Sequence, residues 1–176
     1  KPLYLIGGTM GVGKTSACRA LQQLLPNSVF LDGDWCWNIH PFQVTEETKA
    51  LVLDNICYLL NRFLRCSVVE SVIFCWVMDL QSTLDEILSR LDTSDCTVKS
   101  ISLVCHPEVL LKRLQKDVDE GLREPDILER APARLSRYGA LDTVKLDVSA
   151  STPQEVAMQI AAQQTGCAMM GGRDSP

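Results

Sequence analysis

The feature that most constrains the fold of this chain is a glycine-rich octapeptide directly after an apolar run near the N-terminus. The octapeptide, residues 8–15, reads Gly-Thr-Met-Gly-Val-Gly-Lys-Thr, and the apolar run covers residues 3–6. A G-x-x-x-x-G-K-[S/T] pattern between a strand and a helix is typical of a loop whose backbone amides surround phosphate oxygens. Helical spacing of apolar residues continues after the loop until Pro26. The sequence therefore predicts a strand, a phosphate-binding loop and a helix in succession.

The loop residues predict the binding of a nucleoside triphosphate with Mg²⁺. Lys14 is expected to reach the β- and γ-phosphates, and the Thr15 hydroxyl is expected to be a ligand of Mg²⁺. The helix that follows directs the positive end of its dipole at the phosphates. A glycine-rich turn that matches the pattern by chance is the alternative. The other residues expected to bind the nucleotide, which we take to be ATP, are Gly8, Met10, Gly11, Val12, Gly13 and Ser16.

Composition and charge limit the classes of partner. A chain of 176 residues is long enough for one domain and too short for two ordinary ones. The net charge of -5 and the isoelectric point near 5.0 argue against nucleic acid or an anionic membrane as the main partner. The eight cysteines include no C-x-x-C pair, and no apolar stretch reaches the ~18 residues of a membrane span. We therefore expect a cytoplasmic protein with reduced cysteines.

Apolar runs alternate with helical patterns along the chain. Strands are predicted at residues 3–6, 28–32, 67–77, 98–105 and 143–148. Helices are predicted between them, one of which begins after Thr45 as its N-cap. Apolar strands that alternate with helices are typical of a parallel sheet covered on both sides. We expect a three-layer α/β domain with a five-stranded parallel sheet over residues 1–165, and a tail at residues 166–176.

A second motif follows the second predicted strand, where residues 31–34 read Leu-Asp-Gly-Asp. With the phosphate-binding loop, this run resembles the small P-loop kinases that phosphorylate metabolites. The L-D-G-D run is similar to gluconate and adenylylsulfate kinases, and its D-x-D spacing is similar to shikimate kinase. The resemblance implies a P-loop NTPase fold in which Asp32 lies near the loop and holds a water of Mg²⁺. It also implies that Asp34 faces the acceptor hydroxyl as a general base.

The chemistry of phosphoryl transfer gives an independent reason for a carboxylate at this place. A hydroxyl nucleophile loses its proton as it attacks, and a positioned carboxylate supplies roughly 10²- to 10⁴-fold in rate. An Asx turn at the strand end is the alternative, since Asp and Gly are common in such turns. Asp79, which follows the third predicted strand, is a second candidate for the Mg²⁺ water, although a helix N-cap is its favoured interpretation.

A longer match lies in the second half of the chain, where residues 123–138 read REPDILERAPARLSRY. This segment is similar to the lid signature R-x-D-D-x-x-E-x-x-x-x-R-L-x-x-Y of adenylate kinase and its relatives. The resemblance implies a mobile lid at about residues 119–138, whose Arg123 and Arg134 clamp the transferred phosphoryl group. Fixed cations around the phosphoryl oxygens lower the barrier, and closure excludes water. Pro125 departs from the first aspartate of the signature, which affects the expected hinge or its salt bridge.

Three further arginines lie near these motifs. Arg113, on the helix after the fourth predicted strand, resembles the arginine that covers the adenine in these kinases. A partner for the helix dipole is the alternative for this residue. Arg130 and Arg137 share the lid helix, and we interpret both as solvated charges.

Aromatic residues gather beyond Asp34. Trp35, Trp37 and His40 follow it closely, and Trp76 lies at the end of the third predicted strand. Ligands bind beyond the carboxyl ends of the strands in this type of sheet, so these rings predict an aromatic or planar acceptor. Local packing is the alternative for the tryptophans, and a structural hydrogen-bonding role is favoured for His40.

Together the motifs predict an ATP-dependent phosphotransferase that acts on a hydroxyl of a small molecule, as in gluconate, shikimate or chloramphenicol phosphotransferase enzymes. Nucleoside monophosphate kinases bind an acceptor phosphate with arginines between strands two and three, whereas Arg62 and Arg65 lie at the far end of that helix here. Because the lid segment is similar to that of adenylate kinase, a nucleoside or nucleotide kinase is the alternative function. The short chain disfavours an ATPase or switch that acts on a macromolecule, and the acidic charge disfavours a nucleic-acid end kinase.

Overall fold

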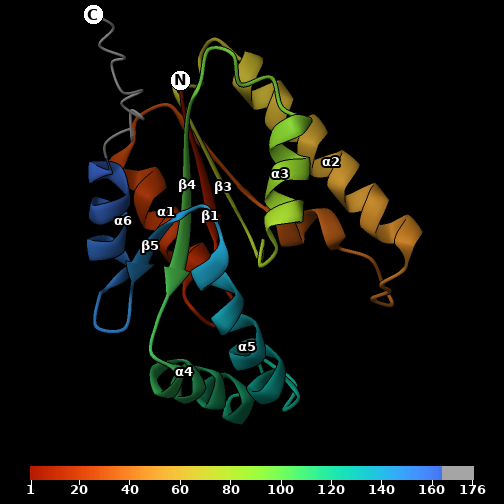
Figure 1. The fold of residues 1–176 in the computed structure, drawn as a ribbon, viewed down its shortest axis with the longest axis vertical. Helices are drawn as coiled ribbons and strands as arrows, with labels where there is room; N and C mark the ends of the chain where they lie inside the picture. The colour runs from red at the N-terminus through yellow and green to blue at the C-terminus, as the bar shows by residue number, and fades with distance from the viewer. Residues whose placement is uncertain (164–176) are drawn as a thin grey trace, which may run out of the picture.

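The computed structural model describes residues 1–163, which form a parallel sheet with helices on both faces (Figure 1). The strands lie in the order β2-β3-β1-β4-β5, and every neighbouring pair is parallel. The strands are β1 Pro2–Gly7, β2 Ser28–Asp32, β3 Ser71–Trp76, β4 Thr97–Val104 and β5 Val144–Asp147.

Helices connect the strands, and several begin at the residues that the sequence predicts. Thr45 is the N-cap of α2, where its hydroxyl accepts a hydrogen bond from the amide of Thr48 at 3.1 Å. Pro107 occupies the first turn of α4. The helices are α1 Lys14–Leu24, α2 Glu46–Arg65, α3 Gln81–Ser89, α4 Pro107–Asp119, α5 Ile127–Leu135 and α6 Pro153–Ala162, with short 3-10 helices η1 Gly33–Trp37 and η2 Ser136–Ala140.

The strand β1 shows why the sheet is buried on both faces. Leu3 and Leu5 belong to the core beneath α2 and α3, whereas Tyr4 and Ile6 belong to the core beneath α1 and α6. Neighbouring residues of a strand point to opposite faces, so a continuous apolar run serves two cores. Figure 1 shows α1 and α6 on one side of the sheet and α2 and α3 on the other. The predicted three-layer α/β fold with a five-stranded parallel sheet is confirmed.

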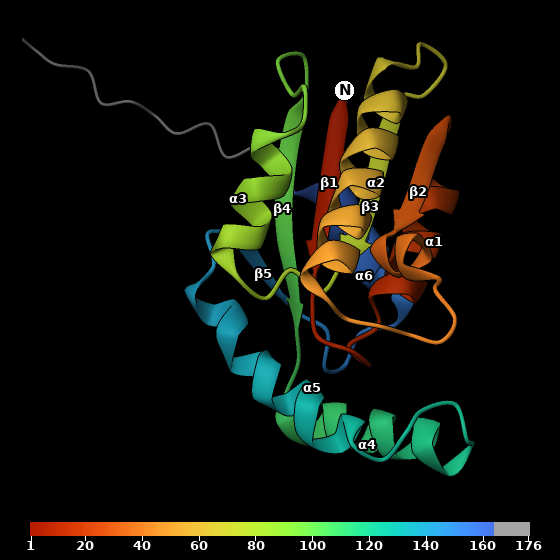
Figure 2. The same cartoon turned by 90° about the vertical axis from the view of Figure 1, so that its right-hand side faces the viewer.

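The helices α4 and α5 lie beyond the carboxyl ends of the strands (Figure 2). Leu110 and Leu114 of α4 are buried in the same core as α1 and α6, and so are Ile127 and Ala131 of α5. Sheets of this type bind ligands at the carboxyl ends of their strands. The pair α4 and α5 therefore borders the end of the sheet where a site is expected.

Two boundaries differ from the sequence prediction by three or more residues. The strand β3 begins at Ser71 instead of residue 67, because the chain before it turns and the amide of Glu70 donates to the carbonyl of Asn27 at 2.7 Å. The helix predicted to continue to Tyr138 ends at Leu135, and the chain tightens into η2. Both differences come from contacts with distant segments, which local residue patterns do not contain.

The last described helix, α6, ends at Ala162, and the tail predicted at residues 166–176 lies outside the described residues. Within residues 1–163, no helix has the length and hydropathy that crossing a bilayer requires. Seven cysteines lie in this range, and all seven are free.

Candidate functional site

Most of the predicted site residues meet in one pocket at the carboxyl ends of β1 and β2. The pocket has a volume of about 420 Å³. Lys116 and Asp117 of α4 also line it, although no sequence motif singled them out. The predicted residues that line the pocket are Met10, Gly11, Gly13, Lys14, Thr15, Ser16, Asp32, Asp34, Arg113 and Arg123.

The phosphate-binding loop requires glycine at two positions. Gly11 and Gly13 have φ angles of 80° and 105°, in the left-handed region that side chains disfavour. A Cβ atom at Gly11 would lie 2.5 Å from a methyl carbon of Leu114, so α4 packs directly against the loop. Gly8 lies outside the pocket lining, and its amide donates to the carbonyl of Val77 at 3.3 Å. The first glycine of the motif therefore joins the loop to the end of β3.

Lys14 is the ammonium group of the pocket. Its Nζ donates to the carbonyl oxygen of Thr9 at 3.1 Å. Burial lowers the pKa of Lys14, and the nearby carboxylates of Asp34 and Asp32 act in the opposite direction. An anion in the pocket would add a partner for this charge, so the residue is suited to hold phosphate.

Thr15 and Asp32, the two residues that sequence analysis predicted for Mg²⁺ and its water, are in direct contact. The Thr15 hydroxyl donates to Oδ2 of Asp32 at 2.8 Å, and Asp32 is buried. The other carboxylate oxygen of Asp32 accepts from the amide of Asp34 at 3.1 Å and caps η1. The Asx turn that sequence analysis left as the alternative is thus present together with the contact to Thr15. One carboxylate performs both tasks because each oxygen has its own partner.

Asp34 lies two residues further, at the edge of the pocket. The indole Nε1–H of Trp76 donates to its Oδ1 at 3.2 Å. Desolvation of the carboxyl and the neighbouring charge of Asp32 raise the pKa of Asp34, whereas Lys14, the Trp76 hydrogen bond and Arg123 act to lower it. A carboxylate with a raised pKa is a stronger base, which suits the acceptance of a proton.

The two predicted lid arginines lie in different surroundings. Arg123 lines the pocket, where its Nε donates to Oδ2 of Asp117 at 2.9 Å. Arg134 lies outside the pocket lining, and its Nη1 contacts Oδ2 of Asp79 at 3.5 Å. Of the two predicted lid arginines, Arg123 lines the pocket and Arg134 does not.

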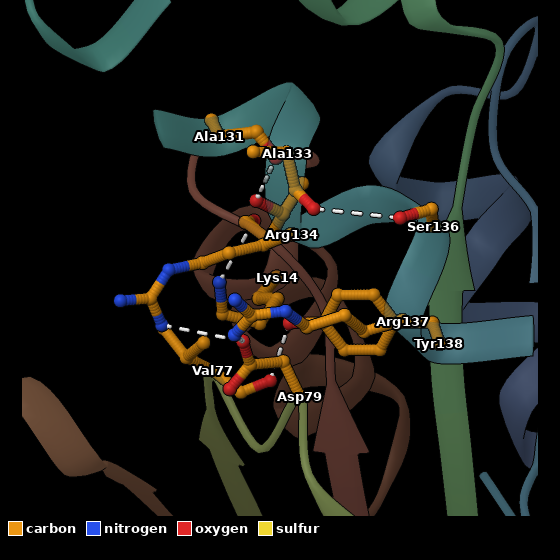
Figure 3. Close-up of polar contacts among 10 residues, drawn as sticks. Lys14, Val77, Asp79, Ala131, Ala133, Arg134, Ser136, Arg137 and Tyr138 are labelled. Atoms are coloured by element: carbon orange, nitrogen blue, oxygen red, sulfur yellow. Dashed lines mark hydrogen bonds and ion pairs between the residues drawn. The ribbon is translucent and has the colours of Figure 1, made fainter. Parts of the chain in front are cut away.

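Asp79 has a different role from the N-cap that the sequence favoured. The helix α3 has Leu80 at its N-cap, without a side-chain cap. The Asp79 carboxylate, nearly buried, instead accepts from Arg134 and, at 2.6 Å, from Nη1 of Arg137 (Figure 3). The N-cap interpretation of Asp79 was wrong, and so was the interpretation of Arg137 as a purely solvated charge. Arg130, by contrast, pairs with Asp126 on the surface.

Two hydrogen bonds tie the C-terminal part of the predicted lid to the phosphate loop and to the residue after β3. The Thr9 hydroxyl donates to the carbonyl of Ala131 at 2.8 Å. The buried Tyr138 donates its hydroxyl proton to the carbonyl of Val77 at 2.6 Å, beside the arginine pair of Figure 3. Val77 also accepts from the amide of Gly8. The C-terminal half of the predicted lid is therefore tied to the segments that follow β1 and β3.

Arg113 lies in the middle of α4 and contacts two backbone carbonyls. Its guanidinium donates to Val12 at 3.2 Å and to Val148 at 3.0 Å. Because it is away from the C-terminal end of α4, the helix-dipole alternative does not apply. A second pocket of about 220 Å³ adjoins it, lined in part by Val12, Ser151 and Pro153. This pocket lies beside the loop, where a nucleotide base would extend from bound phosphates.

The predicted aromatic residues separate into two groups. Trp37 lies 5.7 Å from Phe42 and 6.4 Å from Trp76 between ring centroids, so these three rings form one surface next to Asp34. Trp35 instead packs edge-on against Phe30 of β2. His40 is exposed, and its side chain forms no hydrogen bond within residues 1–163. The structural hydrogen-bonding role expected for His40 is not present.

Sequence reasoning missed Lys116 and Asp117 in the pocket and Arg137 at the lid base. Lys116 lies three residues after Arg113, a spacing that places two side chains on one side of a helix and could have identified it. The pairing of Arg137 with Asp79 joins residues 58 positions apart, for which the sequence contains no local signal.

Comparison with known proteins places this geometry in a family. Residues 5–130 match the AAA_18 family, described as an AAA domain. A comparison with curated protein sequences finds no match.

Solved structures with the same fold include three proteins of similar size. A tunicamycin resistance protein from Deinococcus radiodurans is 23% identical, with a TM-score of 0.67 over 92% of this chain and 94% of that chain. A gluconokinase from Sinorhizobium meliloti 1021 is 20% identical, with a TM-score of 0.66 over 90% and 89%. Shikimate kinase from Aquifex aeolicus vf5 is 21% identical, with a TM-score of 0.56 over 92% and 94%. The chain belongs to the AAA_18 family, described as an AAA domain, and has the P-loop small-molecule kinase fold that its motifs predicted.

Proposed function

We propose that this protein transfers the γ-phosphoryl group of Mg-ATP to a hydroxyl of a small-molecule acceptor. The observation that carries the proposal is the contact between the Thr15 hydroxyl and the Asp32 carboxylate at 2.8 Å, in the pocket that Lys14 and Asp34 also line. These four side chains supply a cation for phosphates, two oxygens for a divalent ion and a base for a hydroxyl. The gluconokinase and the shikimate kinase named above support the same class of reaction.

The donor set of Thr15 and Asp32 fits Mg²⁺. Both atoms are hard oxygen donors, and within residues 1–163 no group of three or more acidic, histidine or cysteine residues forms a separate metal site. Mg²⁺ in kinases is usually held by one or two protein groups together with phosphate oxygens and water. When bound, it would neutralise charge on the β- and γ-phosphates.

The protein side chains divide the reaction between them. Lys14 holds the β- and γ-phosphates as a point charge, and Asp34 accepts the proton of the acceptor hydroxyl as its oxygen attacks the γ-phosphorus. The bond from the γ-phosphorus to the bridging oxygen breaks, and ADP leaves with that electron pair. Arg123 exchanges Asp117 for the phosphoryl oxygens as the lid residues close, and Arg134 completes the clamp. Arg113 positions the base of ATP at the neighbouring pocket.

The test compares Asp34→Asn with Asp85→Asn in a phosphoryl-transfer assay with radiolabelled ATP. Asn keeps the size of the side chain but cannot accept the proton, so transfer is expected to fall roughly 10²- to 10⁴-fold while Mg-ATP affinity is retained. Asp85 lies on the exposed side of α3, bonded to Gln81, and its replacement is expected to leave turnover unchanged. Equal turnover in wild-type protein and Asp34→Asn would remove Asp34 from the mechanism.

A further inference from the structure

A cluster of three aromatic rings lies beside the proposed catalytic base. We call the rings of Trp37, Phe42 and Trp76 the aromatic wall. The Trp37 ring lies 5.7 Å from Phe42 and 6.4 Å from Trp76 between centroids, and it is tilted by 44° and 46° against them. Trp37 and Trp76 are half-buried and rest on the core under α2, whereas Phe42 is 67% exposed. The wall therefore has a fixed part supported by the core and an open part that faces solvent.

The wall and Asp34 form one structural unit. The Trp76 indole donates to Oδ1 of Asp34 at 3.2 Å. The same indole lies directly on the backbone of Gly33, where a Cβ atom would come within 2.6 Å of two ring carbons. A flat group that stacks on this wall is thus held next to the carboxylate, with its substituents within reach of the base.

The cations that the lid contributes to this end of the sheet already have acidic partners. Arg134 and Arg137 share Asp79, and Arg123 is paired with Asp117. In the proposed transfer Arg123 and Arg134 leave these partners for the phosphoryl oxygens, so neither is available to bind a negative charge of the acceptor as well.

The segment between β2 and β3 offers no free cation near the wall either. Its lysine, Lys49, is paired with Glu46 at 2.8 Å, and its arginines, Arg62 and Arg65, lie in the last turn of α2. Lys14 is required for the phosphates of ATP. Lys116 of α4 also lines the pocket, where its side chain is 74% exposed and lies 3.8 Å from Glu120. Within residues 1–163, the one cation seated over an aromatic ring is Lys99 over Tyr4, so none covers the wall. Recognition of the acceptor at the wall therefore depends on ring stacking and hydrogen bonds.

We propose that the acceptor is an uncharged compound with a flat ring and a free hydroxyl, whose ring stacks on the aromatic wall while its hydroxyl meets Asp34. The inference rests on the proposed function and names its substrate class. The acceptor O–H proton passes to the Asp34 carboxylate, the acceptor oxygen bonds to the γ-phosphorus, and the bond between that phosphorus and the bridging oxygen breaks. Nothing is oxidised or reduced, and the products are ADP and the phosphate ester.

The first test measures phosphoryl transfer from labelled Mg-ATP to two sets of probes. The uncharged set contains 4-nitrobenzyl alcohol, 1-phenyl-1,2-ethanediol, chloramphenicol, uridine and adenosine, and the anionic set contains gluconate, shikimate and AMP. We expect a labelled ester with at least one uncharged probe and none with the anionic probes, and the probe that reacts separates aryl alcohols from nucleosides. Transfer to an anionic probe, or no transfer to any uncharged probe, would overturn the proposal.

The second test uses the reacting probe with variants of the wall. Trp37→Leu is expected to raise the KM for the acceptor about 10-fold or more, while the KM for ATP and kcat stay within about twofold of wild type. Phe42→Leu, at an exposed position that the fold tolerates, is expected to raise the same KM less. Trp35→Leu is the matched control, because Trp35 packs on Phe30 away from the wall. An equal rise in Trp35→Leu and Trp37→Leu would contradict ring stacking on the wall.

The failure of this inference can be distinguished from failure of the proposed function. Calorimetric titration with Mg-ATP tests nucleotide binding without an acceptor. A protein that binds Mg-ATP and phosphorylates gluconate would retain the proposed function and lose the acceptor class. A protein that does not bind Mg-ATP would lose both.

Discussion

The phosphate-loop edge and the lid base border the same end of the sheet but are built in different ways. The phosphate-loop edge comprises residues 8–15 and 31–34, and its partners Thr15 and Asp32 lie on the first two elements after β1. The lid base comprises α5 and η2, and its arginines depend on Asp79, which is more than 50 positions away. Local backbone geometry determines the structure of the phosphate-loop edge. Contacts between distant segments determine the structure of the lid base. We therefore expect substitutions in the first to stop chemistry and substitutions in the second to loosen the lid.

The largest expected effect in this comparison comes from Gly11→Ala, where Leu114 of α4 packs against the phosphate-loop edge. The left-handed φ of 80° and the 2.5 Å approach of Leu114 leave no room for a methyl group. Strain and overpacking together are expected to lower the free energy of unfolding by about 2 to 4 kcal/mol and to weaken Mg-ATP binding. Urea unfolding and calorimetric titration measure the two effects.

The control for this substitution is Gly139→Ala in η2, where a Cβ atom meets no other atom within 4 Å. It is expected to change the free energy of unfolding by less than about 1 kcal/mol. Equal effects at the two positions would show that packing of α4 on the phosphate loop does not stabilise the site.

A smaller effect is expected from Asp79→Asn at the lid base. The substitution removes the charge shared by Arg134 and Arg137, whose side chains are 37% and 49% exposed, so solvent screening limits the cost to about 1 kcal/mol. Amide exchange is expected to become faster in residues 127–140 and to stay unchanged in α1. Hydrogen–deuterium exchange with mass spectrometry measures both segments.

The surface pair on the same helix provides the comparison for the lid base. Asp126→Asn removes the partner of Arg130, and both side chains of that pair are more than half exposed. This variant is expected to leave exchange in residues 127–140 within error of wild type. Identical exchange in Asp79→Asn and wild type would mean that the pair with Asp79 does not hold the lid.

The smallest expected effect concerns the pH dependence of phosphoryl transfer. It tests whether Asp34 of the phosphate-loop edge is the general base. Asp34 must be ionised to accept a proton, and its pKa is raised, so kcat falls about tenfold per pH unit once the pH drops below that pKa. Trp76→Phe removes a hydrogen bond that lowers this pKa. The acid limb of the pH–rate profile is therefore expected to move to higher pH.

Trp35→Phe is the control for the pH profile, since the Trp35 ring packs on Phe30 and makes no hydrogen bond to Asp34. Its acid limb is expected to coincide with that of the wild type. A shift of the acid limb to lower pH in Trp76→Phe would contradict the conclusion that the Trp76 hydrogen bond lowers the pKa of Asp34.

The phosphate-loop edge could be predicted from the sequence to a greater extent than the lid base. The strand, loop and helix around Lys14 were predicted because glycine spacing and apolar periodicity act over a few residues. The resemblance to small P-loop kinases implied that Asp32 lies near the loop, and the structure shows it in direct contact with Thr15. The fold class was predictable because uninterrupted apolar strands that alternate with helices permit few arrangements.

What the sequence could not supply are contacts between distant segments. The hydrogen bond from Trp76 to Asp34 spans 42 positions, and the pair of Arg137 with Asp79 spans 58. Asp is a common residue at helix N-caps, so the position of Asp79 before α3 predicted that role. Only the folded chain shows that two arginines pair with its carboxylate. The lid signature located Arg134 in the chain, but its position relative to the pocket depends on how α5 docks.

The central claim is that Thr15 and Asp32 bind the divalent ion that accompanies ATP. Calorimetric titration of a non-hydrolysable ATP analogue, with and without Mg²⁺, tests it most directly in wild-type protein, Thr15→Ala and Thr15→Ser. Our account predicts that Mg²⁺ increases affinity in the wild type and in Thr15→Ser, which keeps the hydroxyl, and that Thr15→Ala loses most of this gain. An undiminished gain from Mg²⁺ in Thr15→Ala would contradict it.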